Sequence, residues 1–465
     1  MELAALAPDG SGHDVVHPVE VADRAFGGLH RLAVRPSNDP ECTFRIRRYG
    51  EQGIELTRLL PVLESFGLVV VDAIPHRLLP TGGAPAMHID DVGVRVDSPD
   101  GAEALRFVPD IHGPRLVSAL DAVARGETDV DSLNRLVTVA GLDWRQVAVL
   151  RVYLRYWSQV GAGSDPDALA DPLVQFPDFA RSLVGFFQAR FDPTLSRGAD
   201  MAAPGEAAER ARCLAALDLV PHLEQDRVLR GFLALVDATL RTNYFMVDGD
   251  GLHRPAIVVK FDSSLVPDLP QPKPRVEAFV QGPTVEGIHL RAGLIARGGL
   301  RSSDRPRDFR TEVLDLAFAK VKKNAIIVPT GAKGGFVLRN AVPGPASVRA
   351  AYEIFVESLL DVTDNVSGGE TVLPPGVVAR DGPDPYLVVA ADKGTATFSD
   401  LANSVSERVG FWLGDAFASG GSRGYDHKRL GITARGAWVA VSRHFHQLGI
   451  DVQVEPVTVV GVGDM

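Results

Sequence analysis

The sequence predicts an α/β protein in which a small α+β module and a helical region precede a mainly parallel sheet covered by helices. Three observations support this prediction. Strand and helix patterns alternate over residues 40–110, a 3.6-residue hydrophobic period dominates residues 114–245, and strands and helices alternate again from residue 255 onward. The chain has 465 residues, of which 45% are hydrophobic and 23% charged. This ordinary globular composition leaves room for about three domains.

The first 113 residues divide into a leader and a module. Residues 1–30 show no periodicity, and we expect a loose leader there. The segment Phe44–Arg47 alternates as a half-buried strand does. Residues 54–66 predict a helix with a leucine face formed by Leu56, Leu59, Leu60 and Leu63. A buried strand is expected at 67–71, with further strands at 88–96 and 103–108. We therefore assign residues 31–113 to a small α+β module of regulatory type.

The next region, residues 114–250, is expected to be helical. The 3.6-residue period is clearest over 115–125, 143–160, 176–191 and 206–244. Asp143, Asp165 and Pro177 are the predicted helix starts, and Pro166 follows Asp165 at the first helical position.

From residue 251 onward the pattern predicts a second α/β unit. Strands are expected at 256–259, 276–280, 287–290, 325–328, 386–390 and 457–460, and helices at 308–323, 346–361, 398–410 and 434–448. Such alternation is typical of a mainly parallel sheet. We place one domain at 251–433 and the start of another at 434–465.

The net charge and the cysteine content indicate which binding partners and which cellular compartment to expect. The net charge of −11 predicts a surface that repels phosphate backbones and anionic lipid, so no nucleic acid or membrane partner is expected. No apolar run approaches the roughly 18 residues of a membrane span, and the N-terminus lacks the features of a secretory signal. Cys42 and Cys213 cannot form a disulfide framework, which fits a reducing compartment. We expect a cytoplasmic protein without a metal site.

The densest chemical signal is a cluster of cations in this acidic chain. It comprises two glycine-flanked segments, Arg297-Gly-Gly-Leu-Arg301 and Gly331-Ala-Lys333-Gly-Gly335, and the helical pair Lys320 and Lys323 between them. A lysine among glycines after a strand is expected on exposed backbone that a ligand can approach. A pocket lined with cations suits a small dicarboxylate, and crowding would lower the pKa of a lysine toward that of a general base. Any one of these cations could equally be an ordinary surface charge.

Three further segments are weaker candidates on their own. Asp392 follows a predicted buried strand, where α/β sheets bind ligands, although a lone aspartate there is more often a cap or a turn residue. A glycine-rich segment, 414–422, leads toward the helix that begins near Thr433. The last strand runs into Gly461-Val-Gly463-Asp464, which resembles the first turn of a dinucleotide-binding unit.

Together these segments resemble the NAD-specific glutamate dehydrogenases of the very large bacterial type. The resemblance is dense over about 285–465 and extends upstream to about residue 40. The matching blocks read ARGGLRSSDRPRDFRTEV, KNAIIVPTGAKGGF, PYLVVAADKGTATFSDLAN, GFWLGDAFASGGSRGYDHKRLGITARGAW and GIDVQVEPVTVVGVGDM.

The resemblance implies oxidation of L-glutamate to 2-oxoglutarate and ammonia, with NAD as hydride acceptor. It makes Lys333 the lysine that activates water and Asp392 the residue that shuttles a proton to and from the substrate nitrogen. Lys323 would hold the α-carboxylate with Lys320 beside it, and Arg297, or Arg301 as the next candidate, the γ-carboxylate. Thr433 would lie near the nicotinamide, and Gly461, Gly463 and Asp464 would begin the nucleotide site. We expect a homo-oligomer at full length.

The sequence ends at the first turn of the expected Rossmann domain, so we expect a fragment that is inactive alone. Two other interpretations remain open. One is a non-catalytic protein that binds glutamate or 2-oxoglutarate, or that docks a partner. The other is a dehydrogenase of a branched or aromatic amino acid, against which the cation at Arg297 argues because those substrates lack a second carboxylate.

Overall fold

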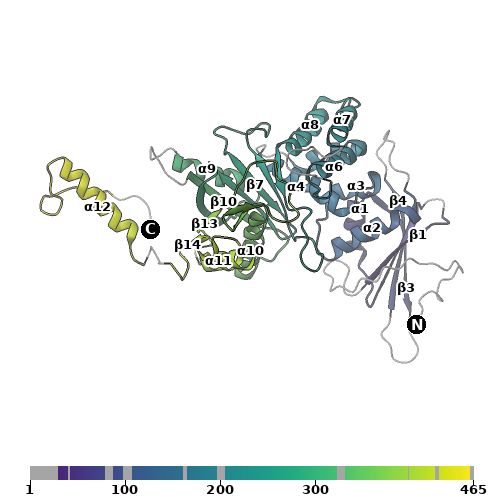
Figure 1. The fold of residues 1–465 in the computed structure, drawn as a ribbon. Coiled ribbons are helices and arrows are strands. Elements are labelled where there is room, and N and C mark those ends of the chain that lie inside the picture. The colour runs from purple at the N-terminus through teal and green to yellow at the C-terminus, as the bar shows by residue number, and fades with distance from the viewer. Residues whose placement is uncertain are drawn as a thin grey trace.

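The computed structural model describes residues 30–39, 42–78, 87–97, 107–160, 165–195, 205–321, 330–395, 397–424 and 429–460. The predicted leader lies almost entirely outside these residues. Figure 1 shows a small sheet at one end, a group of helices beside it, then a large sheet, and helix α12 standing apart at the other end. The predicted mixture of α and β structure is confirmed. No helix in the described part of the chain is long and apolar enough to cross a membrane.

The N-terminal sheet is antiparallel, with strand order β1-β2-β4-β3. It consists of β1 (His30–Pro36), β2 (Phe44–Gly50), β3 (Leu68–Leu78) and β4 (Met87–Val96). Helices α1 (Leu56–Ser65) and α2 (Pro109–Ala124) share a hydrophobic core with one face of this sheet. The alternation predicted for the β2 segment is confirmed by its burial pattern.

Three details of this module differ from the sequence prediction. Leu56 is exposed rather than part of the buried helix face, which Leu59, Val62 and Leu63 form. The strand expected at 67–71 is longer, and Val69 and Val71 in it are exposed because β3 lies at the edge of the sheet with only one face covered. Most of the strand expected at 103–108 lies outside the described residues.

The helical region contains η2 (Ser132–Asn134), α3 (Arg135–Val139), α4 (Trp144–Val160), α5 (Pro166–Gln175), α6 (Pro177–Phe191), α7 (Glu206–Leu217) and α8 (Leu223–Ala238). The predicted start signals are confirmed. The Asp143 carboxylate accepts from the Gln146 amide while the Gln146 side chain accepts from the Asp143 amide, and Asp165 accepts from the amide of Asp167. The single helical span expected over 206–244 is wrong, because a turn separates α7 from α8 and a strand follows α8.

The large sheet has the order β14-β13-β9-β10-β8-β7-β6-β5. Its strands are β5 (Thr239–Thr242), β6 (Ile257–Asp262), β7 (Val276–Gln281), β8 (Val285–Arg291), β9 (Ala296–Ser302), β10 (Thr330–Leu338), β13 (Val388–Ala391) and β14 (Ala418–Ser419). Among the described residues, neighbouring strands from β5 to β8 pair antiparallel, and β8 also pairs antiparallel with β10. The remaining neighbours, from β10 through β9 and β13 to β14, pair parallel. The expectation of a mainly parallel sheet is therefore wrong.

Both faces of the large sheet are buried. Val259, Phe279 and Ile288 pack in the core that contains α4 and α9 (Phe309–Val321). Val258 and Val280 pack in a second core with α10 (Pro345–Asp361), and α11 (Ser399–Arg408) extends that core. The short ribbon β11 (Asn365–Ser367) and β12 (Glu370–Val372) and the turn η3 (Gly414–Ala416) complete the elements between α10 and α12 (Ile432–Gln447).

The glycine-rich segment around Lys333, which was expected on exposed backbone after a strand, is itself part of a strand, as is the segment around Gly298. Arg297-Gly-Gly-Leu-Arg301 lies in β9 and Gly331-Ala-Lys333-Gly-Gly335 lies in β10, which pair side by side. The strand expected at 325–328 lies outside the described residues.

The predicted first strand of a Rossmann domain is not formed over the described residues 457–460, which have irregular backbone. Helix α12, which precedes it, buries none of its residues.

A chain of buried charges joins the antiparallel half of the sheet to the segment that leads into β13. It alternates cations from β5, β6 and β8 with aspartates, in the order Asp364, Arg241, Asp381, Lys260, Asp384 and Arg291. Arg291 holds both oxygens of Asp384 at 2.6 and 2.8 Å, and Lys260 binds it at 2.8 Å. Burial alone would raise the pKa of Asp384, but these two cations outweigh it and hold the pKa at about 2.

Replacing Asp384 by asparagine should destabilise the protein at pH 7 by about 3 kcal/mol, because Arg291 and Lys260 lose their shared counter-charge in a buried site. Since the folded pKa lies below the unfolded value, this stabilisation is present above about pH 4 and disappears as the pH falls toward 2. Urea unfolding at pH 7 and at pH 3 measures both effects. Asp268→Asn, which removes an exposed partner of Arg227, should cost under about 0.5 kcal/mol. Equal losses of unfolding free energy in the two variants would contradict the role of Asp384 as the buried counter-charge of Arg291 and Lys260.

The contact between β9 and β10 gives a second prediction. A Cβ atom at Gly298 would fall on the backbone carbonyl of Ala332, which cannot move without breaking the sheet. Gly298→Ala should therefore cost about 3 kcal/mol of unfolding free energy. Gly331→Ala is the matched control in the neighbouring strand, because nothing lies within 4 Å of the added atom. Thermal unfolding compares the two, and a control that is equally destabilised would show that any side chain in these strands is harmful.

Candidate active site

A cavity of about 270 Å³ lies over the parallel half of the large sheet. Three neighbouring strands line it, with β9 in the centre, β10 on one side and β13 on the other. Its lining residues are Arg297, Gly298, Gly299, Lys333, Val388 to Asp392, and Ser419. The cavity therefore brings together the glycine-flanked cations and the aspartate that the sequence singled out.

Lys333 and Asp392 meet across the middle strand. The ammonium of Lys333 donates to Oδ2 of Asp392 at 2.6 Å, although the two residues belong to β10 and to the end of β13. Strands two places apart are separated by about 10 Å, so the side chains must reach over β9. They can do so because β9 carries glycine there: a Cβ at Gly299 would come within 2.9 Å of the Asp392 carboxylate.

Asp392 is held in one orientation from several sides. Its Oδ1 accepts from the backbone amide of Lys393 at 2.7 Å and from Arg301 at 3.2 Å, and its own amide donates to the Thr395 hydroxyl at 3.0 Å. Partial burial favours a higher pKa for Asp392, but the hydrogen bonds from Lys333 and Lys393 outweigh it and lower the pKa. The side chains of Lys333 and Asp392 are 13% and 16% exposed, so the pair remains open to a ligand.

Arg301 is not free to bind a ligand in the way the sequence suggested. Its guanidinium donates to Glu312 at 2.6 Å as well as to Asp392, and Glu312 also accepts from the Ser303 hydroxyl. These contacts make Arg301 a support for Asp392.

Sequence reasoning did not single out Thr395 or Glu312. Thr395 was detectable, because a threonine three residues after an aspartate is typical of a turn closed by side-chain hydrogen bonds. Glu312 gave no comparable signal.

Arg297 is the cation that faces the cavity without a counter-charge. Its side chain is exposed, and no carboxylate of the described residues forms an ion pair with it. Of the other two predicted substrate cations, Lys320 lies in α9 but its side chain is outside the described residues, as is the whole of Lys323.

The predicted cofactor residues are not brought together by the described part of the chain. Thr433 is exposed on α12, away from the cavity (Figure 1), and Gly461, Gly463 and Asp464 lie outside the described residues. The described residues therefore do not form a dinucleotide-binding site.

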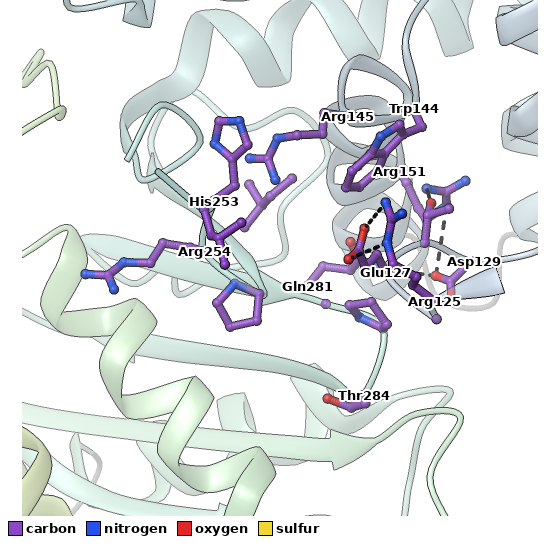
Figure 2. Close-up of a pocket in the computed structure, with 18 of the residues that line it drawn as sticks. Arg125, Glu127, Asp129, Trp144, Arg145, Arg151, His253, Arg254, Gln281 and Thr284 are labelled. Carbon is purple, nitrogen blue, oxygen red and sulfur yellow. Dashed lines mark hydrogen bonds and ion pairs between the residues drawn. The ribbon is translucent and has the colours of Figure 1, made fainter. Parts of the chain in front are cut away.

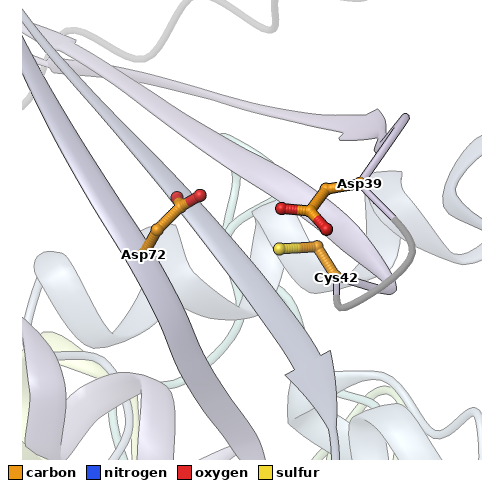
Figure 3. A group of neighbouring side chains, drawn as sticks. All are labelled: Asp39, Cys42 and Asp72. Carbon is orange, nitrogen blue, oxygen red and sulfur yellow. The ribbon is translucent and has the colours of Figure 1, made fainter.

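A second group of possible ligand atoms lies in the N-terminal sheet. Oxygens of Asp39 and Asp72 and the thiol of Cys42 fall within 4.8 Å of one another (Figure 3). Both oxygens of Asp72 already accept from Arg45, at 2.7 and 3.1 Å. Burial and the charge of Asp39 raise the pKa of the Cys42 thiol, which keeps it protonated. A cation would have to displace Arg45, so we assign no metal to this group.

Three family models match separate parts of the chain. Residues 212–465 match the family model for the bacterial NAD-glutamate dehydrogenase catalytic domain. Residues 128–193 match helical motif 3 of glutamate dehydrogenase, and residues 30–106 match its ACT3 domain.

Curated relatives agree with these models. NAD-specific glutamate dehydrogenases from Pseudomonas aeruginosa and Mycobacterium tuberculosis are 46% and 47% identical over 90% of this chain, and the enzyme from Halomonas elongata is 46% identical over 89%. The chain spans about a quarter of the length of these relatives, 25–26%. The chain belongs to the bacterial NAD-glutamate dehydrogenase family.

Proposed function

We propose that the protein of which this chain is part oxidises L-glutamate to 2-oxoglutarate and ammonia, with NAD as the hydride acceptor. The observation that carries the proposal is the Lys333–Asp392 pair in a cavity that Arg297 also lines. The names of the relatives support both the substrate and the cofactor. We also propose that the chain divides into four parts, as the sequence pattern predicts: residues 31–113, 114–250, 251–433 and 434–465.

The cavity suits a small dicarboxylate. Its volume of about 270 Å³ equals the share of about nine water molecules in the liquid. Arg297 lines the cavity and would bind the γ-carboxylate, since a guanidinium can hold both oxygens of a carboxylate. By family resemblance, Lys323 would bind the α-carboxylate with Lys320 beside it. This arrangement favours glutamate over an apolar amino acid, which would leave Arg297 unpaired.

The described residues support the hydrolytic half of the reaction. Once the α-amino group has been oxidised to an iminium, water must add to Cα. Lys333 acts as a base in its neutral form, which forms when its proton passes along the 2.6 Å hydrogen bond to Asp392. Neutral Lys333 then takes a proton from the attacking water.

Asp392 completes the step. The proton that it received from Lys333 is returned to the nitrogen of the tetrahedral intermediate, the C–N bond breaks, and ammonia leaves. The new hydroxyl gives its proton to the Asp392 carboxylate as the ketone of 2-oxoglutarate forms, and Asp392 passes that proton to the departing ammonia, which leaves as ammonium. Arg301 donates to the Asp392 carboxylate and the Thr395 hydroxyl accepts from the Asp392 backbone amide, so both hold the residue in place during the transfers.

The net charge of −11 supports a protein with no nucleic acid or membrane partner, and we propose a cytoplasmic homo-oligomer at full length. A non-catalytic remnant that binds 2-oxoglutarate would have the same cavity. Turnover of glutamate by the parent protein in the first experiment below distinguishes the enzyme from such a remnant.

Lys333→Ala should reduce kcat at least about 1,000-fold in a chain extended to the full length of its relatives, because the base that activates water is lost. The Kd for 2-oxoglutarate should change by less than about threefold if Arg297 supplies most of the binding. Steady-state kinetics and calorimetry measure these two quantities. Lys273→Ala is the control, because the Lys273 ammonium donates to two backbone carbonyls and forms no ion pair with the described residues. A kcat within about tenfold of the parent, or about 1.4 kcal/mol, would exclude Lys333 as the base.

Arg297→Met should lower kcat/KM for glutamate at least about 100-fold more than for norvaline, which has no γ-carboxylate. Both substrates are assayed with the full-length protein, and the ratio of the two losses is the result that matters. Arg305→Met is the matched control, because Arg305 is exposed and Asp308 is its one ion-pair partner in the part of the chain that the structure describes. If both substrates lose equally, Arg297 is structural and the γ-carboxylate is bound elsewhere.

A further inference from the structure

A second and larger cavity, of about 660 Å³, lies between the helical region and the antiparallel half of the large sheet (Figure 2). Four segments line it: the loop after α2, the start of α4, the connection before β6, and the turn between β7 and β8. It shares no lining residue with the cavity at Lys333. A ligand bound here would therefore not occupy the candidate active site.

Most of the arginines around this cavity are neutralised by carboxylates. Arg125 pairs with Glu127 at 2.9 Å, and Arg151 pairs with Asp131 at 2.6 Å. Arg254 binds Asp361 at 3.0 Å. These three cations have counter-charges in the protein and need none from a ligand.

Arg145 differs from them. No carboxylate of the described residues lies within ion-pair distance of it. Its Nη2 donates to the backbone carbonyl of Tyr244 at 3.0 Å, and its guanidinium lies over the rings of Tyr244 and Trp144, 5.0 and 5.8 Å from their centroids. Burial is the main cause of a lowered pKa for Arg145, so this charge is partly removed from water without an anionic partner.

His253 stands next to this cation. Figure 2 shows its imidazole facing the Arg145 guanidinium, with the ring of Trp144 on the other side of that arginine. Burial, and after it the charge of Arg145, lowers the pKa of His253, while Asp143 acts in the opposite direction. Asp143 and Glu127 act on the charge of Arg145 from a distance without forming an ion pair with it, so its guanidinium keeps N–H donors that an anion can use.

We propose that this cavity binds a small organic anion whose carboxylate or phosphate group lies between Arg145 and His253. A guanidinium that is partly desolvated forms stronger charge-assisted hydrogen bonds than one in water, and an anion would supply the missing counter-charge. The apolar part of the ligand would pack along Trp144 and the wall formed by Ala148 and Ile257. The proposal stands independently of the reaction proposed above.

Calorimetric titration of the chain tests the proposal with two probes, acetate and inorganic phosphate. Because Arg297 could bind the same ions, every titration uses the Arg297→Met background. We expect saturable binding of at least one probe, and the tighter of the two identifies the anionic group of the ligand. Arg145→Gln should weaken that binding at least tenfold.

Arg125→Gln is the matched control, because Arg125 lines the same cavity but is already paired with Glu127. It should change the affinity less than threefold. His253→Asn, a replacement at an exposed side chain that does not endanger folding, should weaken binding about threefold or more. Absence of saturable binding for both probes, or equal losses in Arg145→Gln and Arg125→Gln, would overturn the proposal.

Discussion

The position of the candidate active site depends on the buried chain of charges behind the sheet. Arg241, Lys260 and Arg291 belong to three strands of the antiparallel half, and they hold aspartates from the segment that leads into β13. Breaking such a chain leaves a buried charge without a partner, which costs several kcal/mol, so the segment has one favourable position. Asp384 precedes β13 by four residues. Fixing Asp384 therefore fixes where β13 joins β9, and hence where Asp392 emerges.

The buried charges position β13, and the glycines of β9 then allow Lys333 and Asp392 to meet. A sheet normally separates the side chains of strands two places apart, yet Lys333 and Asp392 are hydrogen-bonded over β9. This contact requires that β9 present no side chain between them, and Gly299 meets that requirement. Gly298 serves a different purpose, since it allows the backbone of β10 to approach. The two glycines are thus explained by the close approach of neighbouring groups and not by a turn.

Local patterns predicted most elements but not how they pair. The periods around α4, α6 and α10 gave helices at nearly the observed positions, because a helix shows its buried face within its own sequence. Sheet direction depends on connections. Only residues 282–284 separate β7 from β8, and so short a link can join only antiparallel strands. The prediction of a mainly parallel sheet relied on the alternation of strands and helices and did not take this short link into account. The exposure of Val69 and Val71 depends on which face of β3 a partner covers, and that information is not local.

The site residues were identified by type, whereas their roles depended on partners that the sequence does not show. Arg301 and Arg297 lie in the same strand and looked equivalent, but Glu312 and Asp392 bind the first while the second faces the cavity. The same contrast separates Arg125 from Arg145 in the other cavity. An arginine that lines a cavity with a carboxylate partner stabilises the wall. One that lines it without such a partner carries a charge that no ion pair neutralises, and an anionic ligand can form that ion pair at a gain in free energy. Both cavities are therefore better understood from the pairing of their arginines than from their number.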